Sequence, residues 1–137
     1  MSRLHTGQPM LGIIGGAGVA ATNLLQFRLE EAFTKAGAFR DAHHPEIISH
    51  QATSAPSRSM YLEGRGQSFV PHYQRIAKQL ETAGATLIAM CCNTAHAAYK
   101  EIADVTSVPL VNLIDETIQH VAKSSTQKIG LLASDGC

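Results

Sequence analysis

Residues 87–96 read LIAMCCNTAH: four apolar residues, two cysteines and a polar cluster. A short continuous apolar run bounded by polar residues is typical of a buried parallel strand. Asn93 and Thr94 then predict a cap, followed by a helix over residues 95–104. Cys92 would therefore lie where a strand ends and a helix begins. Open α/β sheets bind ligands at that edge, and a helix dipole there favours thiolate over thiol, so the stretch predicts a reactive cysteine.

The rest of the chain repeats this alternation of apolar runs and helical spacing. We expect further strands over residues 10–14, 47–50, 109–113 and 128–133, and further helices over residues 20–36, 69–83 and 116–122. Such an order predicts an α/β fold with a parallel sheet and helices on both faces. The long connection over residues 51–66 is rich in Ser, Pro and Gly, and long ordered connections of this kind are often functional.

Composition excludes several classes of protein. The 137 residues are 45% hydrophobic and 16% charged, with 11 basic and 11 acidic residues and no net charge. Without a basic stripe we expect no nucleic-acid partner, and without a long apolar run we expect no membrane segment. Three cysteines, two of them adjacent, do not suggest a disulfide framework, so a cytoplasmic location is the expectation.

A glycine turn follows the first expected strand. Residues 12–18 read GIIGGAG, and a dinucleotide-binding turn would need Gly-x-Gly-x-x-Gly with an acidic residue about 20 positions further on. Ala21 stands at the third glycine position, and the acidic residue is missing, so a dinucleotide is disfavoured. Two interpretations stay open. The glycines allow a tight turn, or their backbone N–H groups accept a small anion such as a carboxylate.

Several residues around the cysteines have two interpretations. His96 could act as a base or polariser on the same helix face as Cys92, or it could be a packing histidine that hydrogen-bonds the end of the sheet. Cys91 points away from Cys92 along a strand and is expected in the core. A metal site built from Cys91, Cys92 and His96 is disfavoured, because adjacent cysteines do not easily face one tetrahedral ion.

Two other polar groups are interpreted as structural. His43 and His44, with Asp41, are expected in a solvated loop and not at a metal. Asp115 and Glu116 are expected to cap the amino end of the next helix.

Five motifs, taken together, resemble those of the aspartate/glutamate racemases of the cofactor-independent, two-cysteine type. They are LGIIGGAG at residues 11–18, AT at 21–22, SRS at 57–59, CNTAH at 92–96 and GLLA at 130–133. The resemblance implies two similar α/β halves with the active site between them, and neither pyridoxal phosphate nor a metal. One thiol from each half would act on the α-carbon. It also implies a homodimer.

The resemblance also implies roles for individual residues. Cys92 would be the thiol of the first half, and Asn93 and Thr94 would hold the α-carboxylate with backbone N–H groups. Ala17 would lie against the substrate. Arg58 would grip a side-chain carboxylate, for which a bidentate guanidinium is suited.

The chain also departs from the family pattern. Relatives usually carry a longer apolar side chain at position 17 and Pro-Leu where Val19-Ala20 stands. No Gly-Cys-Thr-Glu motif for the second thiol is present, and Cys137 is a poor substitute. We therefore expect a flexible leader over residues 1–9, a first α/β half over 10–113, and over 114–137 a connection and the first strand of a missing second half. Such a fragment would be inactive alone, would expose apolar surface and would associate.

These expectations define a function and its alternatives. The favoured one is an isomerase that interconverts L- and D-aspartate, or glutamate, by two-thiol proton transfer, with a small dicarboxylic amino acid as its ligand. Sister activities remain open: hydantoin racemase, maleate isomerase and malonate decarboxylase. The competing class is a non-enzymatic carboxylate-binding module.

Overall fold

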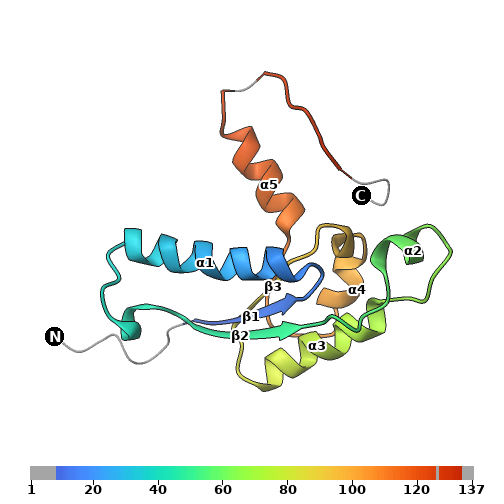
Figure 1. Cartoon of the computed structure of the whole chain (residues 1–137), viewed down its shortest axis with the longest axis horizontal. Helices are drawn as coiled ribbons and strands as arrows, with labels where there is room; N and C mark the ends of the chain where they lie inside the picture. The colour runs from blue at the N-terminus through green and yellow to red at the C-terminus, as the bar shows by residue number, and fades with distance from the viewer. Residues whose placement is uncertain (1–8, 126, 134–137) are drawn as a thin grey trace.

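The fold is a four-stranded parallel sheet between helices, seen in a computed structural model that describes residues 9–125 and 127–133 (Figure 1). The strands lie in the order β2-β1-β3-β4. Their bounds are β1 Met10–Gly15, β2 Glu46–Gln51, β3 Leu87–Met90 and β4 Leu110–Val111. Helices α1, Val19–Lys35, and α3, Val70–Thr82, lie on opposite faces. The predicted fold class is confirmed.

The strand register places alternate residues of β3 on opposite faces of the sheet. Ile14 of β1 pairs with His50 on one side and with Met90 on the other. Ile88 and Met90 are buried, whereas Ala89 between them is half-buried and lines a cavity. Because side chains along a strand alternate, Cys91 and Cys92 leave the strand end toward different faces.

One face of the sheet is fully packed. Helix α3 and helix α4, Tyr99–Ala103, cover it, and the start of α3 is favoured by a proline in its first turn. The main buried side chains on this face are Phe69, Tyr73, Ile76, Leu80, Ile88, Met90 and Ile102. Gly84, at φ +100°, ends the helix in a conformation that favours glycine.

The opposite face is covered less completely. Within α1, which is described along its whole length, Thr22 is the one buried residue. Leu24 and Phe27 of the same helix are about half exposed, at 53% and 54%. Beneath α1 a cavity of about 360 Å³ remains, and its lining includes Ala89 and Val111 of the sheet. The predicted exposure of apolar surface therefore holds for this helix.

Local structure differs from the sequence prediction near Cys92. The predicted helix over 95–104 is a 3-10 helix, η2 Thr94–Ala98, followed by α4. Asn93 precedes η2 without a side-chain capping bond, so Asn93 does not act as the predicted cap. The predicted long connection 51–66 contains a short helix, α2 Arg58–Leu62, whose cap Ser57 accepts a hydrogen bond from the backbone N–H of Met60. A further 3-10 turn, η1, covers Asp41–His43.

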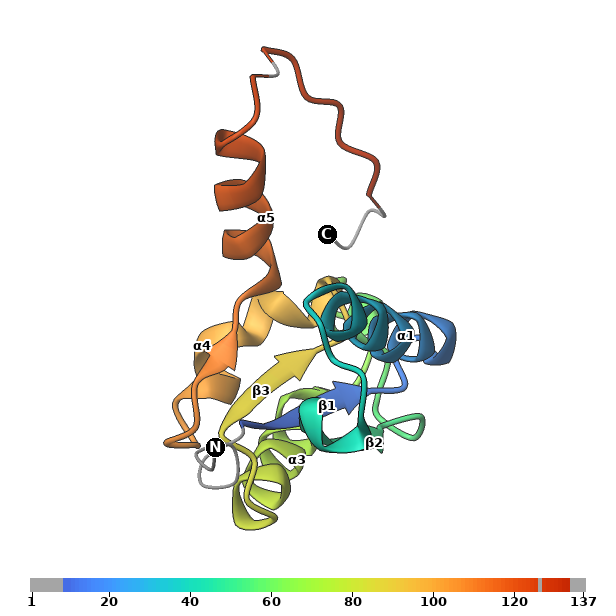
Figure 2. The ribbon, with the colours of Figure 1, turned by 90° about the vertical axis from the view of Figure 1, so that its left-hand side faces the viewer.

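The chain after β4 also differs from the prediction. Helix α5, Leu113–Ala122, begins three residues before the predicted start and extends away from the sheet (Figures 1 and 2). Its cap is Asn112, whose side chain accepts from the N–H groups of Ile114 and Asp115. Asp115 and Glu116 lie in the first turn, where their charge suits the helix dipole, but neither is the cap.

The predicted strand over 128–133 is wrong. In the described residues 127–133 the backbone is irregular, and the side chains of Leu131 and Leu132 are almost fully exposed. A strand needs a neighbour to complete its backbone hydrogen bonds, and the sheet ends at β4. The expected leader over 1–9, except Pro9, and Cys137 lie outside the described residues. No helix in the described residues is both long and apolar enough to cross a membrane.

Candidate functional site

Three neighbouring strands carry the candidate residues at their carboxyl ends. In sheet order, β2 is followed by the loop to Arg58, β1 by the turn that holds Ala17, and β3 by Cys92. Backbone bonds hold these ends together: the N–H of Ala52 donates to Gly15 O at 2.9 Å, and the N–H of Cys91 to Ile14 O at 3.0 Å. The chain reverses its order in the sheet between β1 and β3, which is where open parallel sheets form a binding crevice.

The glycine turn is shaped by Thr22. The N–H of Gly16 donates to Thr22 Oγ1 at 3.0 Å, and that hydroxyl donates to Gly18 O at 3.1 Å. A Cβ on Gly15 would lie 2.4 Å from Thr22 Cγ2, and Gly16 has φ +86°. Gly15 and Gly16 are thus explained by the tight turn alone. The N–H of Gly16 is already engaged and does not serve an anion.

The two adjacent cysteines have different surroundings. Burial raises the pKa of the Cys91 thiol above the ordinary value; the Thr22 side chain of α1 partly offsets this rise, and Cys92 adds to it. Cys92 instead packs against the buried cluster on the α3 face, which includes Tyr73. Both thiols are free and half-buried. The prediction that Cys91 lies in the core is wrong: it is half-buried and lines the cavity beneath α1 together with Cys92.

The cavity beneath α1 touches part of the candidate site. Its volume is about 360 Å³, and its lining is mostly apolar, from Ala21 and Leu25 of α1 to Val111 and Leu113. Cys92 and Asn93 are among the lining residues, whereas Ala17, Arg58 and Thr94 are not. The candidate residues therefore converge on one edge of the sheet without lining a single cavity.

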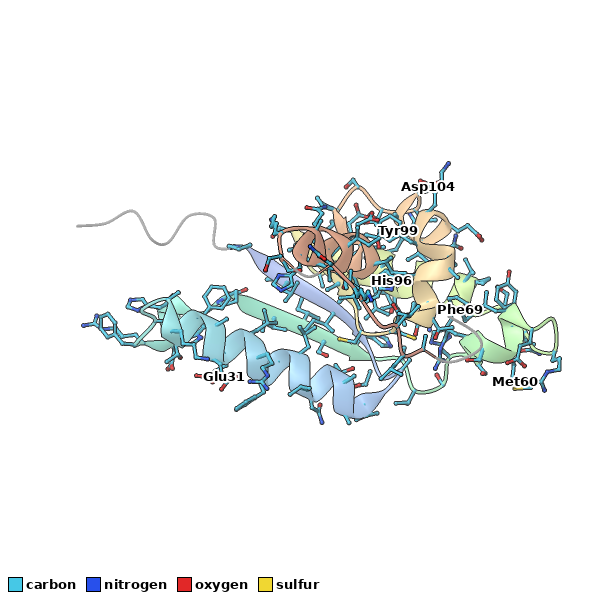
Figure 3. The ribbon with its side chains drawn as sticks, turned by 90° about the horizontal axis from the view of Figure 1, so that it is seen from above. Glu31, Met60, Phe69, His96, Tyr99 and Asp104 are labelled. Carbon is cyan, nitrogen blue, oxygen red and sulfur yellow. The ribbon has the colours of Figure 1, made fainter. Side chains whose placement is uncertain are left out.

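His96 joins the end of β3 to the start of α5. Its Nε2 accepts from the N–H of Leu113 at 3.1 Å, so Nδ1 carries the proton and donates to Cys92 O at 2.8 Å. Its ring stacks on Tyr99, with centroids 6.3 Å apart (Figure 3). Because both ring nitrogens are engaged, the structure favours the packing interpretation of His96 over a role as a base.

Arg58 is anchored beside the site. Its Nη1 donates to Pro56 O at 2.9 Å and lies 3.4 Å from Ala55 O. Its Nε is buried and has no hydrogen-bond partner among the described residues.

Tyr73 is a site neighbour that the sequence reasoning did not single out. Its side chain is fully buried, and burial raises its pKa to about 12, with a further rise from Cys92 and a partial offset from Arg58. The available signal was helical spacing: Tyr73 precedes Ile76, Ala77 and Leu80 on the buried face of α3. That spacing predicted a core residue, and it carried no information on which strand end the hydroxyl would approach.

A metal centre is not evident in the described part of the chain. No group of three or more His, Cys, Asp or Glu side chains there is placed to hold an ion. His43 accepts a hydrogen bond from the N–H of Phe39 at 3.3 Å, and its ring meets the edge of the Phe39 ring. His43 and His44 lie just before β2, far from Cys92 in the sequence. Each is half-buried, whereas the sequence predicted a solvated loop.

Comparison with known proteins gives the family. The family model described as Asp/Glu/Hydantoin racemase matches residues 11–136. The chain belongs to this family. Its resemblance to aspartate/glutamate racemases, drawn from the five motifs, is confirmed.

Individual relatives agree with that assignment. The broad specificity amino-acid racemase RacX of Bacillus subtilis (strain 168) is 26% identical over 125 residues, which cover 89% of this chain and 53% of RacX. The Picrophilus torridus aspartate racemase is 31% identical with a TM-score of 0.77, over 85% of this chain and 48% of that one. An aspartate racemase homologue from Pyrococcus horikoshii OT3 is 27% identical with a TM-score of 0.67, over 85% and 50%. The chain therefore spans about half the length of the relatives it matches.

Proposed function

We propose that the protein is an amino-acid racemase that acts on aspartate or glutamate, with Cys92 as one of its two catalytic thiols. The observation that carries the proposal is the position of Cys92: it follows β3 directly and lies beside the reversal of strand order between β1 and β3. That crevice is where open parallel sheets bind small ligands. Membership in the family and the names of the relatives supply the reaction class.

The reaction requires two thiols on opposite sides of the substrate α-carbon. One thiolate takes the α-proton, and the electron pair of the broken C–H bond stays on the α-carbon and its carboxylate. The opposite thiol then gives its proton to the other face, which inverts the centre and leaves the two sulfurs with exchanged protonation states. Cys92 supplies one thiol, and the second comes from outside residues 9–125 and 127–133.

The neighbouring residues would position the amino acid. Backbone N–H groups of Asn93 and Thr94 would receive the α-carboxylate, and Ala17 would lie against the substrate from the β1 turn. Arg58 would bind the side-chain carboxylate, since a guanidinium matches a carboxylate in charge and shape. The support for this assignment is that Arg58, Ala17 and Cys92 follow three adjacent strands at one edge of the sheet.

The test is exchange of the substrate α-proton, measured by NMR in D₂O with the protein as its full reading frame encodes it. We expect exchange into L- and D-aspartate or glutamate, and a loss of about a hundredfold or more in Cys92→Ser, the scale of a lost proton-transfer group. Cys91→Ser is the matched control. It removes the adjacent thiol, whose pKa burial raises, and should retain most of the activity.

Two outcomes would refute the proposal. Unchanged exchange in Cys92→Ser would exclude a proton-transfer role for this thiol. Absence of exchange with every dicarboxylic amino acid, together with measurable binding of those ligands, would favour the carboxylate-binding module instead.

A further inference from the structure

Two buried hydrogen-bond donors, one in the cluster that Cys92 contacts and one at the start of α2, lack acceptors among the described residues. Among the described residues, three buried side-chain polar atoms have no partner, and two of them are the Tyr73 hydroxyl and Arg58 Nε. An unsatisfied buried polar group is costly, and native structures retain few of them. Cys92 and Tyr61 of α2 both pack against the buried cluster that includes Tyr73. Helix α2, which begins at Arg58, also contacts η2, just beyond Cys92.

The ring of Tyr73 is held so that its hydroxyl cannot turn to water. Phe69 meets it edge to face with centroids 5.3 Å apart, and Tyr61 of α2 meets Phe69 in the same way at 5.5 Å. Tyr73 has no exposed surface at all. A fixed donor that faces no acceptor in the free protein is suited to bind one that arrives.

Arg58 is also held in place with one donor left unpartnered. Its Nη1 is tied to the backbone carbonyls of Ala55 and Pro56, which fixes the guanidinium plane and leaves Nε without a partner. Arg58 is half-buried and its Nε is a buried donor without a partner, and such a cationic group favours the binding of an anion. A carboxylate has two oxygens, so it can accept from the phenol and from Nε at the same time.

We propose that Tyr73 and Arg58 together bind the side-chain carboxylate of the substrate, so that the Tyr73 hydroxyl is a determinant of selectivity for dicarboxylic amino acids. This inference rests on the proposed racemase function and adds Tyr73 to its site. Access requires movement of α2, which carries Arg58. Helix α2 is short and contains no fully buried residue, so its movement separates the Tyr61–Phe69 ring contact but exposes little other packed surface.

The test is a pair of measurements on Tyr73→Phe, with the protein as its full reading frame encodes it and with succinate as an unreactive dicarboxylate. Phenylalanine keeps the ring contact with Phe69 and removes the hydroxyl. We expect the free variant to have a higher Tm than the wild type, because a buried donor without an acceptor is gone. We expect its Kd for succinate, from calorimetric titration, to rise about tenfold or more, as for a lost bond to a charged group.

Tyr99→Phe is the matched control. The hydroxyl of Tyr99 donates to Leu110 O at 2.8 Å, so its removal breaks a real bond. We expect this variant to have a lower Tm and an unchanged Kd for succinate. Butyrate, which has one carboxylate, should bind wild type and Tyr73→Phe equally.

The outcomes separate this inference from the proposed function. An unchanged Kd for succinate in Tyr73→Phe, or a lower Tm in the free variant, would overturn the inference, whatever the exchange activity. Wild-type protein that exchanges α-protons of aspartate or glutamate equally well with and without the Tyr73 hydroxyl, at an unchanged KM, would also overturn it, and would leave the racemase intact.

Discussion

The two faces of the sheet differ in how well they are packed. The α3 face buries Phe69, Tyr73 and Ile88 completely. On the α1 face Leu24 and Phe27 are about half exposed, and a cavity of about 360 Å³ lies between α1 and the sheet. The two adjacent thiols differ in part along the same division: both line this cavity, but Cys92 also packs against the buried cluster of the complete face, whereas Cys91 lies beside Thr22 of α1.

This difference indicates which part of the chain holds the site rigid. Catalytic groups must be held closely to be effective, and residues with locked packing hold them best. Cys92 receives that support from the α3 face. The α1 face contributes less to stability and should accept changes that the other face does not.

The largest effect is expected from truncation on the packed face. Ile88→Ala should lower the free energy of unfolding by about 2–5 kcal/mol, because it leaves a cavity among fully buried neighbours. Leu25→Ala should cost less than about 1 kcal/mol, since Leu25 is half-buried and already lines a cavity. Urea titration with an unchanged m-value measures both. Equal losses would mean that the two faces do not differ in packing.

The next effect concerns the link between the strand end and α5. His96→Phe keeps an aromatic ring against Tyr99 but leaves Cys92 O and the N–H of Leu113 without their partners. We expect a loss of about 2 kcal/mol in the free energy of unfolding, together with reduced α-proton exchange. His96→Asn should recover part of the stability through its amide. Full stability in His96→Phe with exchange abolished would instead support His96 as a base.

Much of this architecture could be predicted from local pattern. The apolar run at residues 87–90 predicts a buried parallel strand, and Cys92 falls at its carboxyl end. The helical spacing of residues 69–83 predicts α3 to within one residue at either end. These features depend on periodicity, which the sequence carries directly.

The remaining features depend on contacts between distant residues. The hydrogen bonds of His96 to Cys92 and Leu113 exist because β4 brings the start of α5 next to η2, and no local pattern specifies that. The predicted strand at 128–133 has the right composition but no partner strand in the described sheet. Tyr73 matches a core position, and its unsatisfied hydroxyl is apparent from the three-dimensional packing alone.

The smallest effect is a difference in reactivity between the two neighbouring thiols. Burial raises the pKa of Cys91 above its ordinary value of 9.0, and Thr22 offsets this rise only in part. We therefore expect iodoacetamide to label Cys92 faster than Cys91 at neutral pH, measured by mass spectrometry on Cys92→Ser and Cys91→Ser, each of which leaves one of the two thiols.

The pH dependence sharpens this prediction. A thiol whose pKa is raised by folding stabilises the fold in its protonated form, so its contribution is complete below pH 9 and is lost as the pH rises through the folded pKa. Labelling of Cys91 should begin to rise above pH 9, while the protein becomes less stable. Equal and slow labelling of both thiols at neutral pH would identify Cys92 as a buried structural cysteine, and the contrast between the two faces would then not extend to reactivity.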